Sequence, residues 1–238
     1  MSSNLNIGKT AMVLAAGLGT RMRPLTETTP KPLIKVSGKP IIEYGFDRLR
    51  EIGIKEAVVN VHYLPDQIIN WCKSFPSPKT LISDESHIVL DTGGGIANAL
   101  PLLGNAPFFV LNSDCFWIDN GEPALRRLQN TWNDATMDCL LLVCDPKHTT
   151  GYNGDGDFVM ASDGRLVRQR QGALAYIGAY LVHPRLFKNA AVEKFSMNIL
   201  WDKAIKQGRL FGVAHHGHWL HVGTPDAISK AEDRLNQA

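Results

Sequence analysis

The amino-acid sequence predicts an α/β protein built around a mixed central sheet whose strands are mostly parallel. Two observations lead to this fold class. In the first half, apolar runs of strand length alternate with longer segments whose apolar residues recur at helical spacing. In the second half, short strand-like runs follow one another with Gly and Asp between them, which is typical of hairpins. Ligands of such sheets bind beyond the carboxyl ends of the parallel strands, so we expect functional residues there.

The first half is expected to contain strands and helices in alternation. Residues 40–52 illustrate the helices, because an apolar stripe runs from Ile41 to Ile52 and Gly53 then stops the helix. The other helices are expected at 64–75, entered through Pro65, and from the glycines at 93–95 through Leu103. The expected strands are 11–16, 57–61, 81–83 and 108–111.

The second half is predicted to hold a helix at about 122–132, a loop and several short strands. Residues 151–157 are too rich in Gly and Asp for regular structure, and 162–164 form a hairpin turn. The expected strands are 137–143, 158–161, 166–168, 175–182 and 210–214, and the remaining helices are 197–207 and 225–236, the last capped by Thr224. Since no repeat or linker interrupts the chain, residues 1–238 are expected to form a single domain.

Composition limits the classes of function. With 238 residues, 44% of them hydrophobic, the chain can bury a sizeable core. A formal charge of +2 without runs of like charge predicts no nucleic-acid partner and no membrane surface. No apolar run reaches membrane length and residues 1–9 lack a signal-peptide core, so we expect a cytoplasmic protein. The cysteines form no CxxC pair and are expected to be free buried thiols: Cys72, Cys115, Cys139 and Cys144.

The segment that follows the first strand has the character of a phosphate site. Small residues let backbone N–H groups approach a ligand, and two arginines and a lysine then supply positive charge. Lys31 lies between two prolines, which restrict the directions of its side chain. The pattern is neither a Walker loop nor a dinucleotide fingerprint, because Met22 stands where the latter needs Gly or Ala. The residues concerned are Ala15, Ala16, Gly17, Gly19, Arg21, Arg23 and Lys31.

Residues 14–26 together with 30–33 resemble the signature of the sugar nucleotidyltransferases, which join a nucleoside triphosphate to a sugar 1-phosphate and release pyrophosphate. The similarity extends from residue 14 to about 231. It implies a three-layer nucleotidyltransferase fold that is Rossmann-like and of the GT-A type. Residues of about 8–135 would be the nucleotide-binding half and about 136–238 the acceptor-sugar half. A monomer or homodimer is expected.

The resemblance assigns roles that fit the chemistry of nucleotidyl transfer, which depends on positioning and charge stabilisation. Arg21 and Lys31 are the expected catalytic residues, with Lys31 on the α-phosphate and the sugar phosphate; Arg23 is a second choice. The expected nucleotide-binding residues are Ala15, Gly17, Gly19, Thr20, Arg21, Lys31, Glu85, Thr92 and Gly93. Read singly, the glycines could form a tight turn and the arginines a solvated face.

Two further segments match family positions. Glu85, Thr92 and Gly93 correspond to the contacts with the nucleobase and ribose, although 92–95 could equally be a plain helix start. Gly156 and Asp157 correspond to the contacts with the acceptor sugar, the substrate-binding residues, for which a turn-forming Asp is the alternative.

The expected metal ligands are Asp114 and, more weakly, His221. The family holds Mg²⁺ with an Asp in the turn that contains Asp114, where the alternative is a helix N-cap. His221 stands here at the position of a second family Asp. This leaves three alternatives: Asp114 and the phosphates hold the ion, His221 acts through water, or the site prefers Mn²⁺ or Co²⁺. A zinc site at 215–218 is disfavoured, because histidines along a strand alternate faces.

Within the family, the chain most resembles the short branch that uses UTP and N-acetylmuramic acid 1-phosphate to make UDP-N-acetylmuramic acid in peptidoglycan recycling of the cell wall. The residues that carry this likeness are 91–95, 99–104, 156–158 and 218–224. One alternative is guanylyl or uridylyl transfer to mannose, heptose or glucose 1-phosphate. Another is a catalytically silent sugar-nucleotide sensor, against which Arg21, Lys31 and Asp114 are all present.

Overall fold

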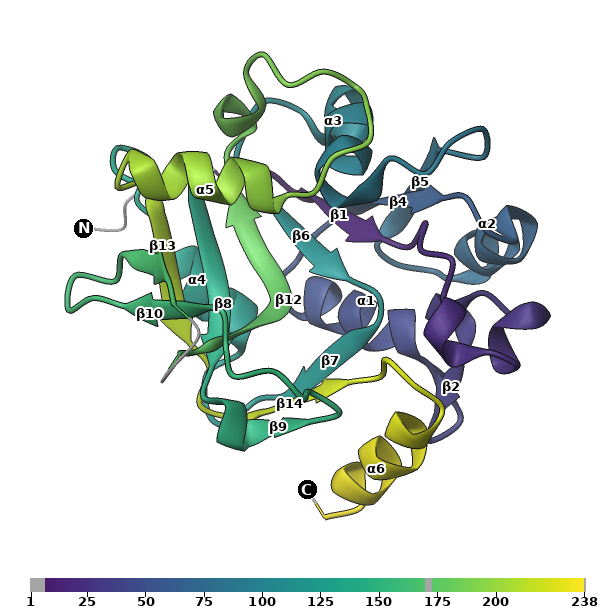
Figure 1. The fold of residues 1–238 in the computed structure, drawn as a ribbon. Helices are drawn as coiled ribbons and strands as arrows, with labels where there is room; N and C mark the ends of the chain where they lie inside the picture. Colours follow the sequence, from purple (N-terminus) through teal and green to yellow (C-terminus); the bar gives the residue numbers. More distant parts are fainter. Residues whose placement is uncertain (1–6, 170–172, 238) are drawn as a thin grey trace.

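A computed structural model describes residues 7–169 and 173–237 and contains a seven-stranded central sheet (Figure 1). The strand order is β13-β8-β12-β6-β1-β4-β5. Every neighbouring pair is parallel except the two that involve β12, which runs antiparallel to β6 and β8. The strands are β1 (Thr10–Leu14), β4 (Glu56–Val61), β5 (Lys79–Asp84), β6 (Phe108–Asn112), β8 (Cys139–Cys144), β12 (Ala175–Val182) and β13 (Leu210–Ala214). The mostly parallel mixed sheet is therefore confirmed.

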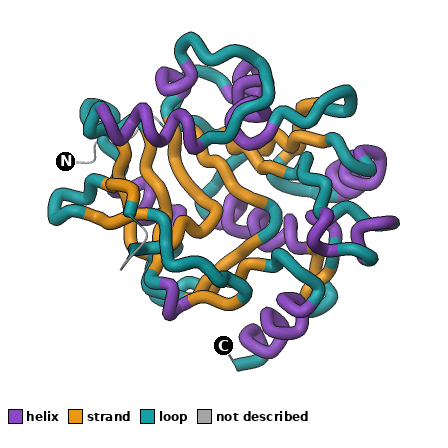
Figure 2. Tube along the Cα trace, viewed as in Figure 1, coloured by secondary structure: helices purple, strands orange, loops and turns teal. Residues whose placement is uncertain are grey.

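Helices cover both faces of this sheet and complete three layers (Figure 2). Alternate residues of β1 divide between two apolar clusters, since Ala11 and Val13 pack on one face and Met12 on the other. The first face carries α1 (Ile41–Glu51), α2 (Pro65–Ser74) and α4 (Ala124–Thr131), and the second carries α3 (Asp91–Leu103) and α5 (Asn198–Lys206).

A smaller sheet connects the two halves of the chain. Its order is β7-β14-β9, formed by β7 (Cys115–Ile118), β14 (His218–His221) and β9 (Thr149–Thr150). A third apolar cluster joins it to α6 (Asp226–Leu235) and to the hairpin of β2 (Lys35–Val36) and β3 (Lys39–Pro40), beside which α6 lies in Figure 1. This arrangement brings the C-terminal segment against residues that follow the loop after β1, residues 15–21, which we call the phosphate loop after its predicted role.

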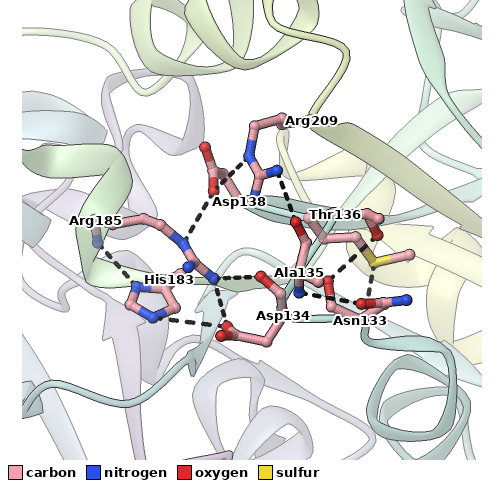
Figure 3. Close-up of polar contacts among 9 residues, drawn as sticks. Asn133, Asp134, Ala135, Thr136, Asp138, His183, Arg185 and Arg209 are labelled. Atoms are coloured by element: carbon pink, nitrogen blue, oxygen red, sulfur yellow. Dashed lines mark hydrogen bonds and ion pairs between the residues drawn. The ribbon is translucent and has the colours of Figure 1, made fainter.

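A polar cluster joins three elements at the edge of the sheet opposite the carboxyl ends of β1 and β6 (Figure 3). The buried Asp138, just before β8, forms ion pairs with Arg185 at 3.0 Å and Arg209 at 2.9 Å. Arg185 also contacts Asp134. Two arginines thus compensate the charge of the buried Asp138 carboxylate and tie the segments before β8 and β13 to the segment that follows β12.

Several sequence-based boundaries differ from the structure. The first strand ends at Leu14, so residues 15–16 belong to the loop. β7 was not predicted, because it follows Asp114 without a Gly or Pro signal. β12 has the expected bounds, and its place as a central antiparallel strand was not predicted. The expected cap at Thr224 is wrong, because α6 begins at Asp226 and has no side-chain cap.

The short hairpin was predicted correctly as β10 (Phe158–Met160) and β11 (Leu166–Arg168). The four cysteines are free and buried, as expected. Among the residues that the structure describes, no helix has the length and apolarity needed to cross a membrane. The assignment of one domain over 1–238, with its two halves, stays a prediction.

Candidate active site

The phosphate loop is fixed by a chain of buried polar contacts that starts at its first residue. The N–H of Ala15 donates to Asn60 Oδ1 at 2.7 Å, and Asn60 Nδ2 donates to Glu85 Oε1 at 2.7 Å. Glu85 Oε2 accepts from the N–H of Leu90 at 3.3 Å, directly before α3. The loop after β1 is thereby tied through the ends of β4 and β5 to the start of α3.

Glu85 acts mainly inside this network. It is 3% exposed, and burial raises the pKa of its carboxyl, an effect that the hydrogen bonds from Asn60 and Leu90 only partly offset. Asn60 is also 3% exposed and was not singled out from the sequence. An amide inside the apolar run of β4 was the available signal, because a buried amide needs partners.

Gly19 allows the loop to approach Lys31 closely. Its φ of +63° lies in the left-handed region, and a Cβ there would stand 2.9 Å from Thr26 Cγ2 and 3.1 Å from Lys31 Cβ. The hydroxyl of Thr26 donates to the Gly19 carbonyl at 2.8 Å and closes the turn. Thr20 and Arg21 follow in a short 3-10 turn and are exposed. Arg23 is exposed as well but lines none of the cavities described below.

Lys31 and Asp114 form the charged pair at the centre of the site. Lys31 Nζ lies 2.8 Å from Asp114 Oδ2, although 83 residues separate the two in sequence. Lys31 is 9% exposed. Burial by itself raises the pKa of Asp114, but the neighbouring His221 and the Lys31 ammonium more than reverse this, so the pKa lies below its usual range.

His221 faces the same carboxylate from β14. Its Nε2 lies 3.7 Å from Asp114 Oδ2, and its Nδ1 lies 3.2 Å from the carbonyl oxygen of Gly151. Because a carbonyl oxygen only accepts hydrogen bonds, Nδ1 carries a proton, and the Nε2 edge of the ring faces Asp114. In the described part of the chain, no group of three or more His, Cys, Asp or Glu side chains could hold a metal ion. Asp114 and His221 are thus a pair of adjacent ligand-type side chains.

The phosphate loop and the charged pair line one wall of a cavity of about 440 Å³. Eight of the expected nucleotide-binding residues line it, and Gly93 does not. Those eight are Ala15, Gly17, Gly19, Thr20, Arg21, Lys31, Glu85 and Thr92. The N–H of Ala15 is already bonded within the protein, so a ligand would meet other atoms of that residue. The cavity is also lined by residues to which the sequence analysis assigned no individual role, namely Asn60, Asp91, Asn112 and Lys194.

The glycines of α3 serve as a docking surface for a segment of the second half. The N–H groups of Gly93 and Gly94 donate to the Phe195 carbonyl at 2.9 and 3.1 Å. A Cβ on Gly93 would stand 2.2 Å from the Phe195 ring. Thr92 Oγ1 accepts from the N–H of Met197 at 2.9 Å. The close approach of residues 195–197 to α3 therefore depends on the absence of side chains there.

A second cavity of about 240 Å³ adjoins the first. The two share four lining residues: Leu14, Asp91, Thr92 and Asn112. Asp157 lines the second cavity, and its Oδ2 accepts from the N–H of Tyr176 at 2.9 Å. Gly156 does not line it, and its N–H donates to the Tyr152 hydroxyl at 3.2 Å. The other polar side chains around it include Arg168, Asn198, Tyr176 and Tyr180.

Comparison with known proteins identifies the family. Residues 10–238 match the family described as Nucleotidyl transferase. The chain belongs to the nucleotidyl transferase family. It is 40% identical to the N-acetylmuramate alpha-1-phosphate uridylyltransferase of Caulobacter vibrioides, over 97% of this chain and 98% of that protein. It is 37% identical to the protein of the same name from Neisseria meningitidis serogroup B, over 93% of this chain and 96% of that protein.

Solved structures agree with this nucleotidyl transferase fold. The inositol-1-phosphate CTP transferase from T. maritima matches with a TM-score of 0.77 at 16% identity, over 97% of this chain and 96% of that chain. A UDP-glucose pyrophosphorylase complexed with UDP-glucose matches with a TM-score of 0.77 at 19% identity, over 97% of this chain and 99% of that chain. At such identities these matches concern the fold.

Proposed function

We propose that this chain joins UTP and N-acetylmuramic acid 1-phosphate to give UDP-N-acetylmuramic acid and pyrophosphate, a step of peptidoglycan recycling. The observation that carries the proposal is the pair of adjoining cavities, of which the first is walled by the phosphate loop and the Lys31–Asp114 pair. Such a pair suits a nucleotide and an acceptor that must react with each other. The two relatives named N-acetylmuramate alpha-1-phosphate uridylyltransferase support the choice of base and sugar.

In the proposed reaction an oxygen of the acceptor phosphate attacks the α-phosphorus of UTP in line. The bond from that phosphorus to the bridging oxygen breaks, and pyrophosphate leaves with the electron pair. Lys31 would hold the α-phosphate and the attacking phosphate, since an ammonium has three N–H donors and Asp114 occupies one. Arg21 and the backbone around Gly19 would hold the departing phosphates, on which negative charge grows.

We also propose a divalent cation, Mg²⁺ or Mn²⁺ or Co²⁺, at Asp114 with His221 as its second protein ligand. The residues fit, because a ligating histidine commonly donates its other N–H to a backbone carbonyl, as His221 does to Gly151. With only two protein ligands, water and phosphate oxygens would complete the shell. The cation would supply positive charge to the triphosphate.

Replacing His221 with Asp tests this assignment. Aspartate adds a hard oxygen ligand and one negative charge, so His221→Asp should lower the Mg²⁺ concentration for half-maximal activity and weaken any preference for Mn²⁺ or Co²⁺. The measurement is a titration of activity with each metal. Overlapping Mg²⁺ curves for the variant and the parent would remove His221 from the metal site.

The proposed function is tested by pyrophosphate release from a panel of substrates. Four nucleoside triphosphates, UTP, GTP, CTP and dTTP, are each combined with the 1-phosphates of N-acetylmuramic acid, N-acetylglucosamine, glucose, mannose and heptose. UTP with N-acetylmuramic acid 1-phosphate should give the highest kcat/KM. A higher value for GTP with mannose or heptose 1-phosphate would support the guanylyltransferase alternative. A chain that binds UDP-sugars but releases no pyrophosphate from any pair would be a sensor.

A further inference from the structure

We propose that Arg168 recognises the lactyl carboxylate of the acceptor and thereby sets the preference for N-acetylmuramic acid over N-acetylglucosamine 1-phosphate. The inference rests on the proposed function and names the residue that reads the chemical difference between these two acceptors. They differ by one group, the carboxylate-bearing lactyl ether of the muramic sugar. A site that selects this group needs a cation where the carboxylate comes to lie.

The charges around the second cavity single out one side chain. Among the described residues that line this cavity, Arg168 is the one that carries a positive charge, whereas Asp91 and Asp157 carry negative charges. Carboxylates can accept hydrogen bonds from sugar hydroxyls, but they repel an acceptor carboxylate. Arg168 therefore decides whether an acidic acceptor can be held here.

Arg168 is held in place with part of its donor capacity free. Its Nε donates to Asp202 Oδ1 at 2.9 Å, and its Nη2 donates to Asn198 Oδ1 at 2.7 Å. Its guanidinium carbon lies 4.5 Å from the ring centre of Phe158 and 5.9 Å from that of Trp201. These two bonds use two of the five N–H groups of a guanidinium. Within the described residues the others remain for a ligand, and the side chain needs little further ordering to bind it.

The aromatic floor of the same cavity supplies an independent sign that it takes a polar ligand. Tyr180 is 1% exposed, and its hydroxyl is buried without a hydrogen-bond partner in the described structure. The hydroxyl of Tyr176 is buried without a partner in the same way, and the two rings lie 6.0 Å apart. Buried hydroxyls are rarely left unpaired, so a ligand with hydroxyl or amide groups would complete them.

The competing interpretation is that Arg168 only joins β11 to α5 through Asp202. Both side chains of that ion pair are more than a third exposed, at 37% and 52%, and exposed pairs contribute little to stability. A variant that lacks the guanidinium should therefore fold. The two interpretations differ in one respect, because only recognition of the carboxylate makes the loss depend on the acceptor.

The experiment measures kcat and KM for both acceptors, with UTP saturating, in the parent and in Arg168→Gln. For N-acetylmuramic acid 1-phosphate, kcat/KM should fall roughly 10- to 100-fold, the scale of a lost charge-assisted hydrogen bond, and mainly through KM. For N-acetylglucosamine 1-phosphate it should change less than about threefold, because that acceptor lacks the carboxylate. Arg168→Lys, which keeps the charge, should recover part of the loss for the acidic acceptor alone.

Two matched controls separate recognition from support. Arg165→Gln removes a neighbouring hairpin arginine that pairs with Asp163 at 3.0 Å but does not line the cavity, and it should alter neither acceptor. Asp202→Asn breaks the same ion pair while Arg168 stays, and it should preserve the preference for the muramic acceptor.

The outcomes distinguish this inference from the proposed function. Equal losses on both acceptors in Arg168→Gln, with the parent preferring the muramic acceptor, would overturn the role of Arg168 and leave the function intact. A parent that does not use N-acetylmuramic acid 1-phosphate, or uses it no better than N-acetylglucosamine 1-phosphate, would overturn both.

Discussion

The two adjoining cavities are built in different ways. The first is made largely by backbone, from a glycine loop at the end of β1, and its charged centre consists of Lys31 and Asp114. The second is made by side chains, with Tyr176, Tyr180 and Arg168 drawn from β12 and β11. A backbone loop suits phosphates, which every nucleotide carries, whereas side chains can be exchanged to suit a particular acceptor. Under the proposed function, the first cavity would therefore serve the chemistry common to the family, and the second would serve selectivity.

The largest effect is expected at Asp114. Asp114→Asn keeps the shape but removes the charge that faces Lys31 and His221, so kcat should fall by roughly 10³ or more and recover little with added Mg²⁺. Asp163→Asn, at an exposed aspartate outside the cavities, is the control. Restoration of full turnover by ordinary Mg²⁺ would mean that Asp114 has a structural role.

Lys31→Ala should reduce turnover by roughly 10² to 10³, the scale of one lost donor to charge that develops in the transition state. The effect should appear with every acceptor, because the residue belongs to the first cavity. Steady-state kinetics with Lys35→Ala, an exposed lysine, gives the baseline. Near-normal turnover would show that the ammonium is not needed at the reacting phosphates.

Asn60→Ala should weaken the binding of UTP and leave the binding of the acceptor unchanged, which would separate the roles of the two cavities. It leaves the Ala15 N–H without its partner and the buried Glu85 carboxylate with only the hydrogen bond from the Leu90 N–H, so the KM for UTP should rise about tenfold while the acceptor KM stays within about twofold. Thermal unfolding should show a loss of about 1–3 kcal/mol. Asn130→Ala removes an exposed amide that bonds Glu122 at 2.9 Å and should change neither quantity. An equal rise in the KM for UTP and in the KM for the acceptor would mean that the substitution loosens the structure around both cavities.

Tyr180→Phe should give the smallest change in kinetics, and this change should concern the acceptor in the second cavity. The hydroxyl has no partner in the described structure, so its removal should not lower the melting temperature. A bound acceptor would lose one neutral hydrogen bond, which raises its KM roughly 2- to 10-fold with UTP unaffected. Tyr44→Phe is the comparison variant. The Tyr44 hydroxyl donates to the Val36 carbonyl at 2.9 Å, and Tyr44 lines neither cavity. An unchanged acceptor KM would mean that the acceptor does not reach Tyr180.

The same contrast explains what the sequence could predict. The glycine loop, Lys31 and Asp114 were recognised because each lies in a contiguous motif directly after a strand. Arg168, Tyr176 and Tyr180 were not, because their convergence depends on the antiparallel placement of β12 between β6 and β8. Such a pairing is set by long-range packing rather than by local pattern.

The sequence predicted where the glycines of α3 lie in the fold, but it did not predict which residues they contact. Residues 93–95 open a helix as expected, but their small size serves to seat Phe195 and Met197 from the other half. Nothing in the local sequence reveals a partner about a hundred residues away. The direct contact of Gly93 with a nucleotide stays a prediction.

The most direct test of the division between the two cavities is a crystal structure with UDP-N-acetylmuramic acid bound. The uridine diphosphate should lie along residues 15–21, with the muramic ring against Tyr176 and Tyr180. A third cavity of about 340 Å³ meets the first at Arg21 and Gly223 and is lined by Tyr152 and Lys230. A sugar bound in that cavity would contradict the assignment of the second cavity to the acceptor.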